Sequence, residues 1–227
     1  MMDGRSRLVR ALPLLVAVGL VPGLQATVAD ADRSVRQFLA QDGSSPAYRA
    51  VRRLEVRNGK RSGWLEAVTE YSPTAGFRYT VTSEGGHAYI RDNVLRAVLE
   101  GEREVIARGE ASRSSLAEVN YTFLANGIGK DGLVNVSLSP RRKERVLVAG
   151  QMFLQPEDGR LVRVEGQLAK SPSFWIRNVD IVRTYERIAG SVVPVAMHSQ
   201  AQMRMFGSAT MTMTYQYSHI NGRPVAR

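Results

Sequence analysis

Strand-length runs with alternating apolar and polar residues fill most of this chain, and they restrict its fold more than any other feature. Seven such runs follow residue 119: NYTFLA, LVNVSLSP, RVLVAGQMFLQP, RLVRVEGQLA, FWIRNVDIVRTYE, VVPVAMHSQAQMRM and ATMTMTYQYSHI. Three more lie in residues 48–82, separated by Asn58-Gly59 and by a turn at residues 73–76. About ten strands in hairpin order predict a mainly β (α+β) protein with a large curved antiparallel sheet or unclosed β-barrel.

One segment breaks this pattern. Residues 87–108 carry apolar side chains three and four apart, which predicts an amphipathic helix, interrupted near Gly101. Another short helix is expected to begin at residues 112–116. A sheet of this size must be covered on its apolar face, and one helix is too small to cover ten strands. The remaining area is where a ligand could bind.

The N-terminus resembles an export signal. Arg5, Arg7 and Arg10 precede an apolar stretch at residues 11–24, and small residues follow. We expect a signal peptide over residues 1–29, cleaved after Ala26 or Ala29. An uncleaved membrane anchor is the alternative, which the shortness of the apolar stretch disfavours. A short helix and linker are expected over residues 30–47, and a single domain over residues 48–227.

The charge and the lack of cysteine limit which cellular compartment and which classes of partner are expected. Without cysteine, the chain forms no disulfide and carries no lipid on an N-terminal cysteine, so it depends on a hydrophobic core. Removal of residues 1–29 takes away three arginines and Asp3 and leaves a formal charge of +8. We expect a periplasmic protein with no nucleic-acid partner, attracted to anionic lipid or acidic protein surfaces.

The sequence carries no recognisable catalytic or metal-binding motif. The three histidines are far apart, and no nucleophile elbow, phosphate loop or zinc motif is present. Glu66 and Glu70 form a carboxylate pair, but they alternate with apolar residues as a solvated strand face does. We therefore expect a protein that is not an enzyme and has no metal site or cofactor.

Residues 203–217, MRMFGSATMTMTYQY, place methionine and tyrosine at odd positions only. Strand parity puts these side chains, with Met197, on one face of a hairpin. We call this set the methionine strip: Met197, Met203, Met205, Met211, Met213 and Tyr215. Two interpretations stay open. The strip is either core beneath the helix or a ligand-binding surface, for which flexible, polarisable methionine is well suited.

A basic run lies between two of the predicted strands. Arg141, Arg142, Lys143 and Arg145 follow Pro140 closely. The simplest interpretation is a charged hairpin tip. The alternative is a docking patch for anionic lipid headgroups or an acidic partner.

Three phrases of the sequence resemble a known superfamily: NYTF at Asn120, VSLSPRRKERVLVAGQMFLQPEDGRLVRVEGQLA from Val136, and YERIAGSVVPVAM from Tyr185. They are similar to the periplasmic lipoprotein carriers LolA and LolB and to the N-terminal domain of RseB/MucB regulators. The resemblance covers residues 48–225 and implies an unclosed β-barrel around an apolar cavity that helices cover. It also implies non-catalytic binding of acyl chains, with Trp175 joining the methionine strip as a counterpart of the cavity residues.

The resulting expectation is a carrier or binding protein for lipid or lipoprotein acyl chains. The main alternative is a sensor or scaffold module of the RseB type that acts through a membrane regulator. Transient contact with an anionic membrane surface or a membrane protein fits both. A hydrolase of unrecognised type is a weaker third hypothesis.

Overall fold

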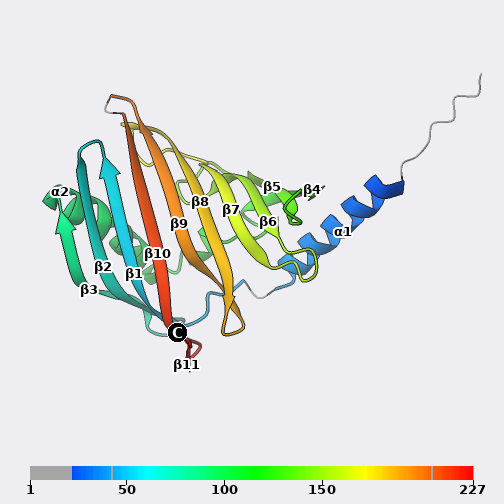
Figure 1. Cartoon of the computed structure of the whole chain (residues 1–227), viewed down its shortest axis with the longest axis horizontal. Coiled ribbons are helices and arrows are strands. Elements are labelled where there is room, and N and C mark those ends of the chain that lie inside the picture. Colours follow the sequence, from blue (N-terminus) through cyan, green and yellow to red (C-terminus); the bar gives the residue numbers. More distant parts are fainter. Residues whose placement is uncertain (1–21, 42, 206, 227) are drawn as a thin grey trace, which may run out of the picture.

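A single eleven-stranded antiparallel sheet forms the body of the protein in the computed structural model, which describes residues 22–41, 43–205 and 207–226 (Figure 1). The strands are β1 (Tyr48–Asn58), β2 (Arg61–Ser72), β3 (Gly76–Gly86), β4 (Tyr121–Ile128), β5 (Val134–Pro140), β6 (Val148–Leu154), β7 (Leu161–Leu168), β8 (Ile176–Ile188), β9 (Ser191–Met203), β10 (Ser208–Ile220) and β11 (Arg223–Pro224). The predicted fold class, a large unclosed antiparallel sheet with helices, is confirmed.

Strand order places the methionine-rich hairpin at the centre of the sheet. The order is β3-β2-β1-β10-β9-β8-β7-β6-β5-β4, and β11 pairs with β10. All neighbours are consecutive in sequence except β1 and β10, which pair along their whole length, from Tyr48 opposite Ile220 to Asn58 opposite Ala209. Among the described strands β3 and β4 remain the two edges, so the sheet does not close.

A pair of glycines bends the sheet between β6 and β7. Gly150 lies directly opposite Gly166, whose φ is +155°. A Cβ on Gly150 would lie 2.1 Å from the Glu165 carbonyl oxygen and 2.5 Å from the Gly166 Cα. The two backbones can approach this closely only because neither residue has a side chain, and such glycine positions are where sheets curve sharply.

Two helical segments cover opposite parts of the sheet. The helix α1 (Pro22–Leu39) packs on β4, β5 and β6. A continuous segment made of α2 (Ala88–Ile90), the π-helical turn η1 (Arg91–Leu95) and α3 (Arg96–Ala107) packs on β1, β2 and β3, and lies behind them in Figure 1. We call this second segment the lid helix. A 3-10 turn, η2 (Ala111–Ser114), follows it, close to the second helix expected from the sequence.

The predicted interruption near Gly101 is wrong. The helix α3 runs through Gly101, and the irregular turn is instead η1. Gly101 is exposed and has no atom within 4 Å of a Cβ position, so it costs only the intrinsic glycine penalty of about 1 kcal/mol. The buried side chains of Leu95 and Leu99 hold the helix on the sheet despite that penalty.

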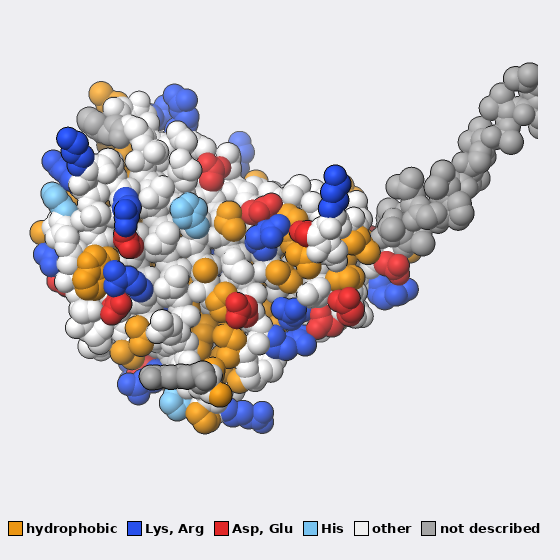
Figure 2. Space-filling view, in the orientation of Figure 1, with side chains coloured by type: hydrophobic (Ala, Val, Ile, Leu, Met, Phe, Trp, Pro, Cys, Tyr) orange, Lys and Arg blue, Asp and Glu red, His pale blue; other side chains and the backbone are white. Residues whose placement is uncertain are grey.

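The same concave face of the sheet carries two separate cores. Core one joins α1 to β4–β7 and contains Ala31, Tyr121, Val134, Val136, Leu138, Leu147, Met152, Leu154, Leu161 and Val164. Core two joins the lid helix to β1–β3 and β10 and contains Leu54, Val56, Leu65, Ala67, Phe77, Ile90, Leu95, Leu99 and Met213. Figure 2 shows the opposite, convex face, where neutral polar side chains and backbone cover much of the surface.

The turn between β6 and β7 packs directly against α1, and Gly159 is the residue that allows this close contact. Its φ is +65°, and a Cβ would lie 2.5 Å from the Ser34 carbonyl oxygen. We expect Gly159→Ala to lower the free energy of unfolding by about 2 kcal/mol, because left-handed strain and overpacking add. The matched control is Gly190→Ala, with φ +85° and open space, which should cost only about 1 kcal/mol. Equal losses in urea denaturation would contradict the role of Gly159 in seating α1.

The N-terminal predictions are met only in part by what the structure describes. The helix α1 begins at Pro22, earlier than the helix expected over residues 30–47, and it contains both predicted cleavage positions. Residues 1–21, most of the predicted signal peptide, lie outside the described residues. In the ranges that are described, no helix has both the length and the hydropathy to cross a membrane.

Candidate functional site

The middle of the concave face lies between the two cores, on strands that the helices reach least. Helix contacts concentrate on β1–β3 and on β4–β6. Strand register places these residues there, on the concave side of β7–β10, and we call them the central trough: Gly166, Val179, Ile181, Arg183, Met197, Ser199, Ala201, Met203, Ala209 and Met211. Most of them are half-buried. Its small residues are Gly166, Ser199, Ala201 and Ala209, and larger side chains such as Ile181 and Met211 lie directly opposite some of them.

The methionine strip divides into core and trough. Met213 is 3% exposed and belongs to core two, directly opposite Leu54 and Met197. Met197, Met211 and Tyr215 are half-buried and pack against that core. Met203 is half-buried at the end of β9, where its Sδ accepts a 3.8 Å hydrogen bond from Asn58 Nδ2. The core interpretation therefore holds for Met213, and the ligand-binding interpretation stays a prediction for the half-buried residues of the strip.

Two of the predicted cavity residues lie outside the trough. Met205 is 69% exposed at the β9–β10 turn, and Trp175 is 58% exposed on the loop before β8. Trp175 stacks edge-on against Phe174, with ring centroids 5.4 Å apart, and the Arg204 guanidinium lies 5.1 Å from the Phe174 ring. Loop and turn positions do not follow strand parity, which is why the sequence pattern placed them wrongly.

A buried ion pair, which the sequence pattern did not predict, joins the lid helix to the sheet. The side chain of Arg52 is 3% exposed. Its Nη1 donates to Glu102 Oε2 at 2.6 Å and its Nη2 to Glu102 Oε1 at 3.0 Å. The guanidinium also lies over the rings of Phe77 and Tyr215, at 5.0 and 4.7 Å. Burial alone would lower the pKa of Arg52, but the hydrogen bonds and charge of Glu102, together with the Tyr215 and Tyr48 oxygens, outweigh it, and the pKa lies above its ordinary value.

A second arginine, Arg183, lies where the two cores meet. On β8 it is paired in register with Val164 of core one and with Met197, which packs on core two. Its Nη2 donates to the Met197 Sδ at 3.6 Å, and it is hydrogen-bonded to Tyr185. The Tyr185 oxygen raises the pKa of Arg183, which outweighs the opposing effect of burial, so the guanidinium stays charged. Its Nε is buried and donates to no group in the described residues.

Parity could have revealed both arginines. Arg52 alternates with Ala50 and Leu54 on β1, and Arg183 alternates with Ile181 on β8, so each stands on the apolar side of its strand. A charged residue on the apolar side of a strand is the sequence signal for such an inward position, because charged side chains are rarely buried without a partner.

The basic run at residues 140–145 has two different roles. Arg141 Nε donates to the carbonyl oxygens of Glu118 and Tyr121, at 2.7 and 3.2 Å. Arg142 donates to Glu144 at 2.6 Å and to Asn120 Oδ1 at 2.7 Å. These two arginines therefore hold the start of β4 in place, and they are not free to bind a partner.

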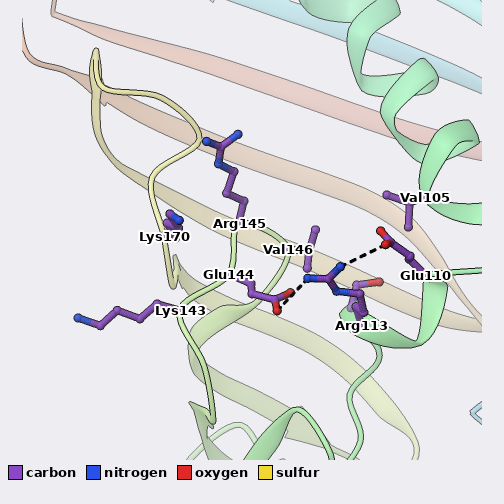
Figure 3. A pocket seen from close by; sticks show the side chains of 9 residues that line it. Val105, Glu110, Arg113, Lys143, Glu144, Arg145, Val146 and Lys170 are labelled. Atoms are coloured by element: carbon purple, nitrogen blue, oxygen red, sulfur yellow. Dashed lines mark hydrogen bonds and ion pairs between the residues drawn. The ribbon is translucent and has the colours of Figure 1, made fainter. Parts of the chain in front are cut away.

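Lys143 and Arg145 instead line an open cavity of about 310 Å³, together with Val105, Glu110, Arg113, Ser114, Glu144, Val146 and Lys170. Figure 3 shows Arg113 held between Glu110 and Glu144, while Lys143 and Arg145 extend away from this pair. In the described part of the chain, neither of these two cations has an ion-pair partner. Of the four residues of the predicted docking patch, only Lys143 and Arg145 thus lack an ion-pair or hydrogen-bond partner in the described residues, and Lys170 lines the same cavity.

The carboxylates considered for catalysis are surface ion pairs. Glu66 accepts hydrogen bonds from Arg53 and Ser83, which lower its pKa, so it is an ordinary ionised carboxylate. Glu70 lies near Arg49 and Arg78, at 3.5 Å from each. Within the described ranges, no three His, Cys, Asp or Glu residues are placed to share a metal ion.

Several solved structures are similar to this chain, although no protein-family model and no curated protein sequence matches it. A LolA superfamily protein from Nitrosomonas europaea matches with a TM-score of 0.43 at 8% identity, over 89% of this chain and 94% of that one. A DUF1329 family protein from Desulfovibrio piger matches with a TM-score of 0.38 at 10% identity, over 85% and 90%. A chain of the Pseudomonas aeruginosa MucA/MucB complex matches with a TM-score of 0.23 at 12% identity, over 87% and 100%. Both groups that the sequence resembles are thus among the structural matches, while at these identities and TM-scores no residue role is transferred to this chain.

Proposed function

We propose that this chain is a periplasmic, non-catalytic binding protein that holds an acyl chain of a lipid or lipoprotein along the central trough. The observation that supports this most is the arrangement of the concave face. Two cores occupy its ends, and the strands between them present half-buried methionine, small residues and little helix cover. Such a surface gains free energy by burying an apolar chain.

Length and chemistry are compatible with an acyl chain. Met197 and Met203 are six residues apart on β9, which corresponds to roughly 20 Å of strand. Each methylene of an acyl chain buried there contributes about 0.8 kcal/mol, so a long chain binds without a dense set of polar contacts. The flexible thioether side chains can repack around chains of different length and unsaturation.

An exposed apolar group outside the trough, at the β9–β10 turn and the loop before β8, supports a second candidate function. Phe174, Trp175 and Met205 are 73%, 58% and 69% exposed and lie beside Arg204. Exposed aromatic groups of this kind are typical of protein or membrane contacts. A sensor or scaffold module that acts through a membrane regulator would use such a contact, and it would capture one membrane protein in a fixed ratio.

Native mass spectrometry of the protein purified from a bacterial host tests the binding proposal. We expect adducts with the masses of lipids, and we expect an acylated peptide to displace a hydrophobic dye from the delipidated protein. The same peptide without its acyl group is the control and should displace nothing. A protein that carries no lipid and binds no dye would contradict the proposal.

A further inference from the structure

Two arginines and a single nearby carboxylate give the inner part of the concave face an unbalanced charge. Glu102 uses both of its carboxylate oxygens on Arg52. Arg183 takes part in no ion pair within the described residues, and its polar contacts are the Met197 sulfur and the Tyr185 hydroxyl. Among the described residues the guanidinium of Arg183 thus has no carboxylate bound to it, and the charge of Glu102, which is engaged by Arg52, compensates it only from a distance.

The surroundings of Arg183 make its positive charge unfavourable for the free energy of folding. It is half-buried on an apolar face between Val164 and Met197, and its Nε is buried and has no acceptor in the described residues. A charge removed from water without a counter-ion is strongly unfavourable, and a thioether is a weak acceptor. An apolar residue in this place would join the two cores at lower cost. The arginine is therefore better explained by a ligand than by folding.

The guanidinium also has the right geometry for one class of ligand. Its planar set of donors matches the two oxygens of a carboxylate or phosphate, and such charge-assisted hydrogen bonds are about twice as strong as neutral ones. The Tyr185 hydroxyl lies beside it and adds a donor. Along β9, the concave side continues from Met197 through Ser199 and Ala201 to Met203, which gives an apolar path that leads away from the charge.

We propose that Arg183 binds the anionic headgroup, a carboxylate or phosphate, of an amphiphile whose acyl chain lies along the central trough toward Met203. This inference rests on the proposed acyl-chain function. It adds that the protein selects amphiphiles with an anionic headgroup. The trough would take free fatty acids or phosphorylated lipids in preference to neutral esters of the same chain length. A carboxylate and a phosphate use the same contacts, and the experiment separates the two.

The test compares three probes with the same sixteen-carbon chain: hexadecanoic acid, its methyl ester and hexadecyl phosphate. Binding to the delipidated protein is measured by displacement of a hydrophobic dye. We expect the wild type to bind at least one anionic probe about tenfold or more tightly than the ester, from the strength of a charged hydrogen bond. Tighter binding of the acid indicates a fatty acid as the natural ligand, and tighter binding of the phosphate indicates a phosphorylated lipid.

Substitutions on β8 test whether Arg183 is the residue responsible for the preference for anionic probes. In R183Q the anion preference should vanish, so that acid, phosphate and ester bind about equally, and R183K should retain part of the preference because it keeps the charge. The matched control is R177Q, which removes the same charge from an exposed position of the same strand and should keep the full preference.

The outcomes separate the two proposals. Equal binding of acid, phosphate and ester by the wild type would overturn the role of Arg183 and leave acyl-chain binding intact. The same preference in R183Q as in the wild type would also overturn it. Binding of none of the three probes would overturn both proposals together. The comparison of probes on the wild type holds even if R183Q fails to fold.

Discussion

Met213→Asp is expected to prevent folding, whereas Met203→Asp should leave the fold intact and remove acyl-chain binding. Met213 is 3% exposed and lies in core two, opposite Leu54 and Met197. A carboxylate there has no partner and costs several kcal/mol, and the lost apolar contacts add to this. Because the total stability of a domain is about 5–15 kcal/mol, the expected result is loss of the far-UV circular dichroism spectrum of the sheet.

Met203 should behave differently because it is half-buried at the end of β9. An aspartate there reaches water, so we expect a stability loss of about 1 kcal/mol or less in urea denaturation. The same charge placed against an acyl chain should reduce dye and lipid binding about tenfold or more. Met203→Leu is the matched control and should bind normally. Unfolding of the Met203→Asp variant, or unchanged binding by it, would show that Met203 does not line the binding surface.

The sequence pattern was sufficient to predict the sheet, because alternation reports directly which side of each strand faces apolar surroundings. It also predicted the lid helix from its three- and four-residue spacing. It did not predict the strand order, since the pairing of β1 with β10 depends on contacts 150 or more positions apart in the chain. That pairing decides that the methionine-rich hairpin lies in the centre of the sheet rather than at its edge.

Only those residues of the candidate site that lie on strands could be predicted from the sequence. Parity placed Met197, Met211, Met213 and Tyr215 on the concave side, but could not say which of them a helix would cover. The positions of Trp175 and Met205 were missed because loop and turn geometry is set by tertiary contacts. The two inward arginines were missed because a polar residue in a strand is ordinarily assigned to the solvent side.

Glu102→Gln is expected to lower the free energy of unfolding by about 3 kcal/mol. The substitution leaves Arg52, whose side chain is 3% exposed, without its carboxylate. We take the lower end of the range for a broken buried pair because the Glu102 side chain is 35% exposed and partly screened. Urea denaturation measures the effect. The control is Glu104→Gln, which breaks an exposed pair with Arg108 on the same helix and should change stability by about 0.5 kcal/mol or less.

The double variant R52M/E102L separates the cost of an unpaired charge from the value of the pair. Replacement of a buried pair by apolar residues of similar size is often neutral or stabilising, so the double variant should regain most of the stability that Glu102→Gln loses. Recovery would mean that the pair fixes the position of the lid helix more than it contributes net stability. If the double variant were as unstable as Glu102→Gln, the bidentate contact itself would be the main attachment of the lid helix to β1. In either case the charge of Arg52 is paired with the Glu102 carboxylate, whereas Arg183 has no ion-pair partner in the described residues. This difference in charge pairing is the physical reason for assigning only Arg183 to a ligand, since the Nε of both arginines is buried without an acceptor there.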